Sequence, residues 1–101
     1  MSVTVVTRWT TPNVAASTNI AKRSRAIFMK HGARDARLSQ IFTGPYTGQW
    51  LFAVAYADMA TYAKVSAAVT ASAAMKKLQA DNMKVGAVMQ EREILVGVDI
   101  D

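Results

Sequence analysis

The sequence contains no cysteine, and this absence removes several chemical classes at once. Disulfide bridges, thiolate nucleophiles and cysteine-ligated zinc or iron–sulfur sites are all excluded. Histidine occurs once, and the only acid at ligand spacing from it is Asp35. We therefore expect no metal site and no cofactor, so that any chemistry depends on ordinary side chains.

Long apolar runs and a leader segment are also lacking. No run approaches the ~20 residues that span a bilayer. The opening segment, MSVTVVTRWTTP, has no basic stretch followed by an apolar one. These absences predict a cytoplasmic protein without membrane association. The length of 101 residues leaves no room for a second core, so residues 1–101 are expected to form one domain.

Acidic residues are scarce beside basic ones, 7 against 12, and the net charge is +5. Residues 22–37 contain six of the basic residues and one acid, so this segment carries a charge equal to the whole excess. Such a segment is typical of a solvated helix face or of a surface that attracts anions, nucleic acid included. Its one aromatic residue, Phe28, falls on the apolar side of the predicted helix, so nucleic-acid binding is the weaker interpretation.

Hydrophobic periodicity predicts six elements in the order strand, helix, strand, strand, helix, strand. The strands are expected at residues 2–10, 35–43, 50–57 and 87–98, and the helices at residues 14–31 and 58–83. Thr11 or Asn13 is placed to cap the first helix, and Asp58 to cap the second. Gly86 is placed to end the second helix. That helix is apolar on two sides, which indicates burial on both sides or a break near residues 66–72.

The strand expected at residues 50–57 is apolar on both faces, although strands of small open sheets normally alternate apolar and polar residues. One face carries Trp50, Phe52, Val54 and Tyr56, and the other carries Leu51, Ala53, Ala55 and Ala57. The βαββαβ order places this strand at the centre of a four-stranded antiparallel sheet with both helices on one face, a ferredoxin-like α+β fold. Leaving the outer face bare forfeits about 1.5–3 kcal/mol per large side chain. A second copy of the chain is the simplest cover, so we predict a homodimer.

Charged residues on the first and last strands need partners. The last strand is expected to alternate regularly, so that Met89 shares a face with Glu91 and Glu93. Arg8 lies on a central strand, where an unpaired guanidinium is costly. Its partner is either a carboxylate, such as Glu91 or Glu93, or an anionic ligand. Arg92 on the last strand raises the same choice with less force.

The element order, the length, the segment TGQWLFAVAYAD leading directly into a capped helix, and the long last strand resemble the dimeric α+β barrel superfamily. The chain looks most like its NIPSNAP-like and stress-responsive Dabb-type members. The resemblance covers nearly the whole chain and implies two sheets facing each other in a homodimeric barrel, with a pocket in each subunit between sheet and helices. Members include cofactor-free monooxygenases, isomerases, cyclases, haem-degrading enzymes and proteins of no known activity, so the fold does not determine the function.

Aromatic side chains on the central strands are candidates for stacking a planar apolar ligand, and they are equally typical of a core or a dimer interface. The ligand-binding candidates are these aromatic residues together with Arg8 and the second-helix tyrosine, namely Arg8, Trp9, Trp50, Phe52, Tyr56 and Tyr62. In the superfamily's cofactor-free monooxygenases, an Asn on the first strand, a Trp on the third and a His on the second helix cooperate. Trp50 matches the Trp, but this chain has no such Asn and no His in residues 59–84. These departures count against oxygenase and haem-degrading activities.

His31 ends the first predicted helix on its apolar side and is the catalytic candidate. It is either a general base or acid at the mouth of a pocket, or a ring that caps the last carbonyls of the helix. Two functions follow from these patterns. In the first, a homodimeric barrel binds a small apolar or aromatic ligand, either neutral or anionic. In the second, the chain is a cofactor-independent isomerase, cyclase or monooxygenase that uses His31 as general base.

Overall fold

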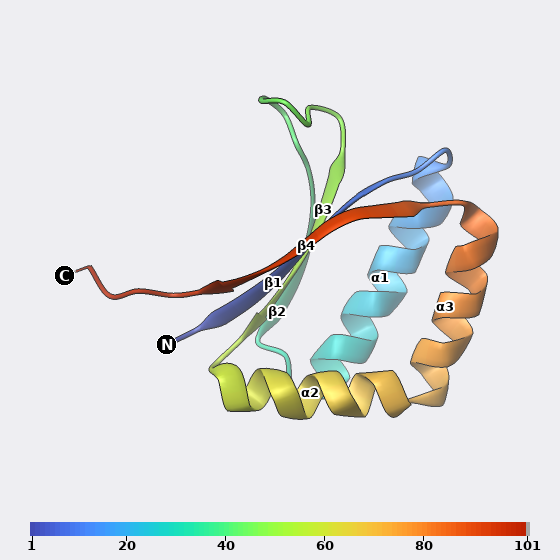
Figure 1. Cartoon of the computed structure of the whole chain (residues 1–101). Coiled ribbons are helices and arrows are strands. Elements are labelled where there is room, and N and C mark those ends of the chain that lie inside the picture. The colour runs from blue at the N-terminus through green and yellow to red at the C-terminus, as the bar shows by residue number, and fades with distance from the viewer. Residues whose placement is uncertain (101) are drawn as a thin grey trace.

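In the computed structural model, which describes residues 1–100, three helices cover one face of a four-stranded sheet (Figure 1). In chain order the elements are β1 Val3–Thr10, α1 Val14–Lys30, β2 Asp35–Gln40, β3 Trp50–Tyr56, α2 Met59–Ala71, α3 Ala73–Val85 and β4 Val88–Val96. This is the predicted βαββαβ order, with the second helix divided in two. The fold is ferredoxin-like α+β, as predicted.

The strands lie in the order β2-β3-β1-β4, and every neighbouring pair is antiparallel. β1 and β3 are therefore central, as expected, and pair from Val3 with Tyr56 to Trp9 with Trp50. Alternation along these strands sends one set of side chains towards the helices and the other to the outer face of the sheet. We call these two sides of the sheet the inner face and the outer face.

A protruding loop joins β2 to β3 and completes the predicted hairpin (Figure 1). β2 ends at Gln40 and is shorter than the predicted strand, and the turn itself lies at residues 45–48. The N–H of Ile41 donates to the Gln49 carbonyl at 2.8 Å, and the N–H of Gly48 donates to the Ile41 carbonyl at 2.8 Å. Gly48 has a φ of +90°, a conformation that favours glycine.

Two of the predicted caps and the predicted stop are present. The Asn13 side chain accepts from the N–H of Ala16 at 3.0 Å at the start of α1, and Asp58 accepts from the N–H of Thr61 at 2.7 Å at the start of α2. Each bond satisfies an N–H that has no partner within the first helical turn. Gly86, at φ +83°, ends α3 in the left-handed conformation.

The break between α2 and α3 lies at Ser72, whose backbone is extended (φ −74°, ψ 141°). Its hydroxyl donates to the Val69 carbonyl at 2.8 Å and accepts from the N–H of Met75 at 3.1 Å, so one side chain ends α2 and caps α3. α2 buries Val65 and Val69, whereas α3 turns and buries Met75 and Leu78. The interpretation of one straight helix buried on two sides is therefore wrong, and the alternative of a break is confirmed.

The pairing of β1 with β4 is interrupted by a bulge. The register shifts between Arg8 and Trp9, because Gln90 is an extra residue on β4. Met89 consequently lies on the inner face together with Arg92, and both line the same cavity. The expectation that Met89 shares a face with the glutamates of this strand is wrong, because regular alternation does not continue through a bulge.

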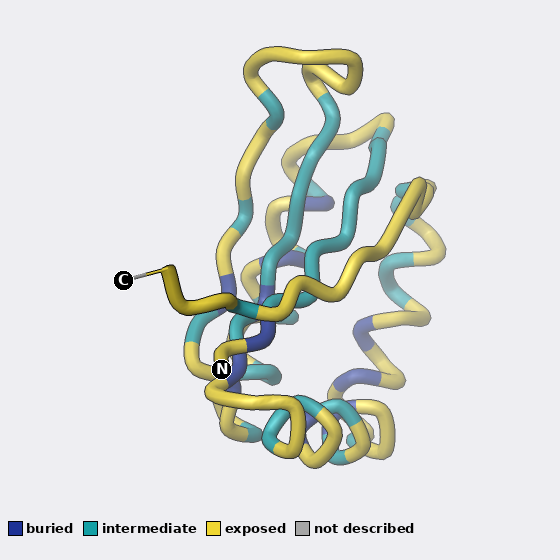
Figure 2. The backbone as a smooth tube through the Cα atoms, turned by 60° about the vertical axis from the view of Figure 1, so that its left-hand side comes forward, coloured by how far each residue is buried: buried dark blue, intermediate teal, exposed yellow. Residues whose placement is uncertain are grey.

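The core lies between the inner face and the helices, where β1 and β3 meet α2 (Figure 2). Its buried members are Val3, Ala33, Ala36, Val54, Tyr56, Val65, Val69, Met75 and Leu78. β4 is exposed along its whole length (Figure 2). Within residues 1–100, no helix combines the length and the apolar character that crossing a membrane requires.

Candidate functional site

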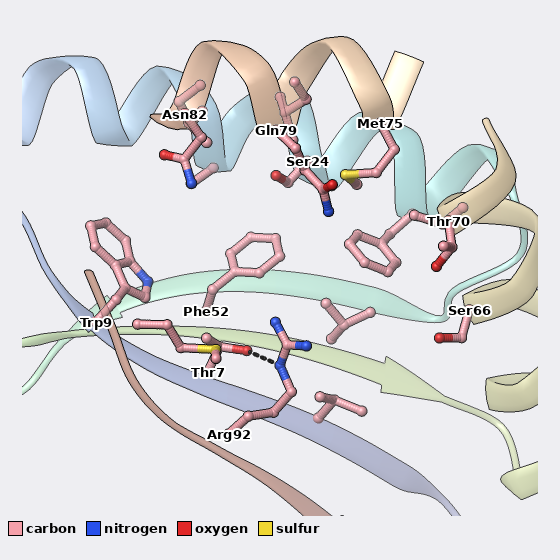
Figure 3. Close-up of a pocket in the computed structure, with 18 of the residues that line it drawn as sticks. Thr7, Trp9, Ser24, Phe52, Ser66, Thr70, Met75, Gln79, Asn82 and Arg92 are labelled. Carbon is pink, nitrogen blue, oxygen red and sulfur yellow. Dashed lines mark hydrogen bonds between the residues drawn. The ribbon is translucent and has the colours of Figure 1, made fainter. Parts of the chain in front are cut away.

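A cavity of about 320 Å³ lies between the inner face of the sheet and the three helices. This volume is at the small end of the ~300–1,000 Å³ that is usual for ligand sites. Side chains from β1, β3 and β4 line one side, and side chains from α1, α2 and α3 line the other (Figure 3). The cavity is open to solvent on the β4 side, where Met89 and Arg92 line it and are exposed.

Aromatic rings form much of the cavity wall. Phe28 of α1 lies against Phe52 of β3, with ring centroids 6.4 Å apart and planes tilted by 49°. Trp9 of β1 lines the cavity and stacks on Trp50, with centroids 5.9 Å apart. A wall of this kind offers ring faces and edges to a planar apolar molecule.

Polar side chains converge on the same space from both sides. The guanidinium of Arg92 points from β4 into the cavity, and its Nε donates to the Thr7 hydroxyl at 3.1 Å (Figure 3). Gln79 and Asn82 of α3 and Ser24 of α1 lie on the helix side of the cavity (Figure 3). Among residues 1–100, no carboxylate forms an ion pair with Arg92. The cavity thus combines an aromatic wall with one cation and several neutral hydrogen-bonding groups.

The remaining ionisable groups of the cavity are two tyrosines. The Tyr56 ring is 2% exposed and meets the Tyr62 ring edge-on, with centroids 5.2 Å apart. Burial raises the pKa of Tyr56 to about 12, so its phenol stays protonated at neutral pH. Among the described residues that line the cavity, none is a carboxylate or an imidazole.

Four of the predicted ligand-binding residues line this cavity, namely Trp9, Phe52, Tyr56 and Tyr62. Tyr56 is also one of the most deeply buried side chains, so it contributes more to the core than to accessible surface. Trp50 lies on the inner face but contacts the cavity only through Trp9, on which it stacks.

Arg8 lies on the outer face, away from the cavity. Its Nη2 is 3.3 Å from a carboxylate oxygen of Glu91, which is one of the two partners considered for it. Its Nη1 donates to the side-chain oxygen of Gln49, and its guanidinium lies 3.7 Å from the centre of the Tyr46 ring. Of the two choices for Arg8, the structure contains the salt bridge, and alternation along β1 explains why this residue is separate from Trp9.

His31 is also outside the cavity. It follows the last residue of α1, and its backbone N–H donates to the Ile27 carbonyl at 3.2 Å. The residue is half-buried. A catalytic role for His31 therefore stays a prediction, and this side chain does not line the cavity.

Ion pairs within the chain occupy part of the basic segment. Arg23 contacts Asp81 at 2.9 Å, and this pair joins α1 to α3. Arg25 donates to the Ala36 carbonyl at 3.0 Å and lies 3.6 Å from a carboxylate oxygen of Asp35. These contacts favour the interpretation of a solvated helix face. No group of three or more metal-ligating side chains occurs within residues 1–100.

Sequence reasoning missed most of the polar groups of the cavity. The sequence indicated that Arg92 needs a partner but did not assign it to a site. It gave no indication of a role for Gln79, Asn82 or Ser24. The spacing of Gln79 and Asn82, three residues apart on one helix face, is a usable signal only after the break at Ser72 fixes the direction of α3.

Several solved structures have a similar fold. SnoaB, described as a cofactor-independent oxygenase from Streptomyces nogalater, is 14% identical, with a TM-score of 0.73 over 98% of this chain and 95% of that one. A NIPSNAP family protein with unknown function from Agrobacterium tumefaciens is 13% identical, with a TM-score of 0.63 over 93% of this chain and 84% of that one. An uncharacterized NIPSNAP-like domain protein from Burkholderia xenovorans is 14% identical, with a TM-score of 0.61 over 98% and 88%. Identities this low show the fold alone.

These structures confirm, at the level of the fold, the predicted resemblance to NIPSNAP-like proteins. A comparison of the sequence with curated proteins finds no match. One family model matches residues 1–95, nearly the whole chain. The chain therefore belongs to the family described as domain of unknown function (DUF6854).

Proposed function

We propose that this protein binds a small, partly aromatic molecule in the cavity between its sheet and its helices. The observation that carries the proposal is the composition of the cavity wall, in which Trp9, Phe28 and Phe52 accompany a single cation, Arg92. Ligand sites in proteins typically combine an apolar wall with a few polar groups that orient the ligand.

Binding is favoured over catalysis because the described residues of the cavity wall supply no general base near neutral pH. The guanidinium of Arg92 offers only N–H donors, and the pKa of Tyr56 is raised to about 12 by burial. Proton transfer is most effective from a group whose pKa is close to the working pH. A ligand in this cavity therefore meets hydrogen-bond donors and aromatic surface but no group suited to removing a proton.

A second candidate function is that of a cofactor-independent isomerase, cyclase or monooxygenase. It is supported by the position of Arg92, since a cation at an aromatic cavity can stabilise an oxyanion that forms during a reaction. SnoaB, which has a similar fold, is described as a cofactor-independent oxygenase. In this candidate, loss of turnover in His31→Ala supports the predicted base, whereas unchanged turnover places the base on the substrate or elsewhere.

A binding test uses N-phenyl-naphthylamine, a neutral probe whose fluorescence rises in apolar surroundings. We expect saturable binding by the native protein. Ser24→Phe places a ring in the cavity and should abolish binding without loss of thermal stability. Ala26→Phe adds the same ring to an exposed position of the same helix and should bind normally. Equal binding by all three proteins would overturn the proposal.

We also propose that the protein is a homodimer whose subunits pack through the outer face. The helices cover only the inner face (Figure 1). Val6, Leu51 and Leu95 line a hollow on the outer face, and β4 exposes several apolar side chains, with Leu95 at 50%. A two-fold axis covers such a face by burying identical patches against each other. An edge strand with apolar residues on both sides otherwise invites aggregation.

The oligomeric state is measured by light scattering at micromolar concentration. We expect twice the chain mass of 10.9 kDa. Ala53→Glu places a carboxylate at the middle of the outer face, opposite Arg37, and should give the monomer mass, because burying this charge pair in an interface is costly. Ala63→Glu makes the same change on the exposed side of α2 and should leave the dimer intact. A monomer mass for the native chain would contradict the proposal.

A further inference from the structure

Among residues 1–100, Arg92 is the one formally charged side chain that lines the cavity. It is held by a neutral partner, the Thr7 hydroxyl, and no carboxylate within residues 1–100 neutralises it. An unneutralised cation beside aromatic surface favours a ligand of opposite charge.

The hydrogen bond to Thr7 determines which part of the guanidinium is available. A guanidinium has five N–H groups, and only Nε–H is used by Thr7. The two Nη groups extend into the cavity towards the helices (Figure 3). Their parallel N–H bonds match the two oxygens of a carboxylate in a bidentate pair.

The surroundings of Arg92 favour a ligand with a single negative charge. The polar groups on the opposite side of the cavity, from Ser24, Gln79 and Asn82, are neutral donors and acceptors. A phosphate monoester carries about −1.5 to −2 charges at neutral pH and would stay under-neutralised by one guanidinium. A carboxylate carries a single charge and is balanced by Arg92 alone.

We propose that the cavity takes a planar aromatic monocarboxylate, with its carboxylate on the Nη groups of Arg92 and its ring against Phe52 and Trp9. The amide N–H groups of Gln79 add donors on the helix side. This inference rests on the proposed function, namely that the cavity binds a small molecule, and adds the chemical class of that molecule.

Two probes of equal shape test the inference by calorimetry at neutral pH and low salt. Naphthoate carries the carboxylate, and the matching naphthamide is its neutral counterpart. We expect the native protein to bind naphthoate about tenfold or more tightly, since hydrogen bonds between charged groups are the stronger ones. The preference should shrink as salt is added, because the mouth of the cavity is open to solvent.

Three variants assign the preference to Arg92. Arg92→Gln should abolish the preference and leave the affinity for naphthamide within about twofold. Arg92→Lys keeps the charge but lacks the planar fork, so its preference should be intermediate. Arg34→Gln removes a cation from an exposed position outside the cavity and should keep the native preference.

The outcomes separate this inference from the proposed function. If naphthamide binds and naphthoate binds no more tightly, the carboxylate inference is wrong and the cavity still binds small molecules. If neither probe binds and the neutral fluorescent probe also fails, the proposed function is wrong. A preference that persists in Arg92→Gln also overturns the inference, because another group then holds the anion.

Discussion

Arg8 and Arg92 lie close together in the pairing of β1 with β4 but on opposite faces of the sheet. Arg8, on the outer face, has a carboxylate, an amide oxygen and an aromatic ring as partners. Arg92, on the inner face, has one hydroxyl, that of Thr7. A cation whose partners belong to the same chain supports the scaffold, whereas a cation with a single neutral partner in a cavity has capacity left for another molecule.

The largest expected effect is the loss of unfolding free energy when a valine is shortened on each face of the sheet. Val54 on the inner face is 4% exposed, and Val54→Ala should lower the free energy of unfolding by about 2 kcal/mol through lost burial and a larger cavity. Val6 on the outer face is less buried, and Val6→Ala should cost less in dilute solution, as measured by urea unfolding. Equal losses in dilute monomer would contradict a difference between the faces.

Replacing each of the two arginines should give a smaller difference in the free energy of unfolding. Arg8→Met removes the hydrogen bond to Gln49 and the contact with Tyr46, and should lower the free energy of unfolding by about 1 kcal/mol. Arg92→Met loses one bond at an exposed position and should stay within about 0.5 kcal/mol of the native protein. Urea unfolding of both variants measures the difference, and the reverse order would show that Arg92 is the structural cation.

High pH reports on the inner face. Burial raises the pKa of Tyr56 from 10.0 to about 12, so the folded state favours the protonated phenol. The resulting stability is fully present below pH 10 and is lost as the pH rises through about 12. A spectrophotometric titration should contain a late-ionising phenol that belongs to Tyr56, and Tyr56→Phe should remove it. A late phenol that persists in this variant would assign the shift to another tyrosine.

Low pH tests the outer face, where we expect the smallest net change in stability. The hydrogen bond from Glu93, together with Arg8, lowers the pKa of Glu91 below 4.5, and the same bond with the charge of Glu91 raises the pKa of Glu93 above 4.5. Glu91 therefore gives stability that is lost as the pH falls, whereas Glu93 gives stability that is lost as the pH rises, and the two contributions oppose each other.

Carboxyl NMR titration checks this pair directly. We expect the two glutamates to titrate on opposite sides of 4.5 and to depend on each other. Arg8→Met should raise the pKa of Glu91, since the cation that favours its charged form is gone. Arg92→Met, which changes the inner face, should leave the titration of both glutamates unaltered.

The fold was largely predictable because local rules and the global arrangement agree. Alternation placed Trp9 and Phe52 on one face, and the caps Asn13 and Asp58 and the stop Gly86 lie where side-chain chemistry favours them. The position of the helix break was predictable only as an alternative, since a serine within an alanine-rich helix is compatible with either a continuous helix or a cap.

The site was less predictable, because its polar members come from elements far apart in the sequence. Gln79 and Asn82 reach the cavity only because Ser72 redirects α3. The presence of Met89 beside Arg92 depends on a bulge that no residue type in this part of the sequence predicts. Periodicity describes one element at a time, so it cannot show which side chains of three elements converge.

The extra residue in β4 means that this part of the strand can absorb a change of one residue in length. Met89 and Arg92 are three positions apart yet face the same side, which a regular strand forbids. Because the pairs beyond the bulge hold the rest of β4 in register, gaining or losing one residue between Gly86 and Glu91 alters the bulge and leaves the orientation of Arg92 unchanged. Relatives with a longer or shorter turn here are therefore expected to retain the cation of the cavity.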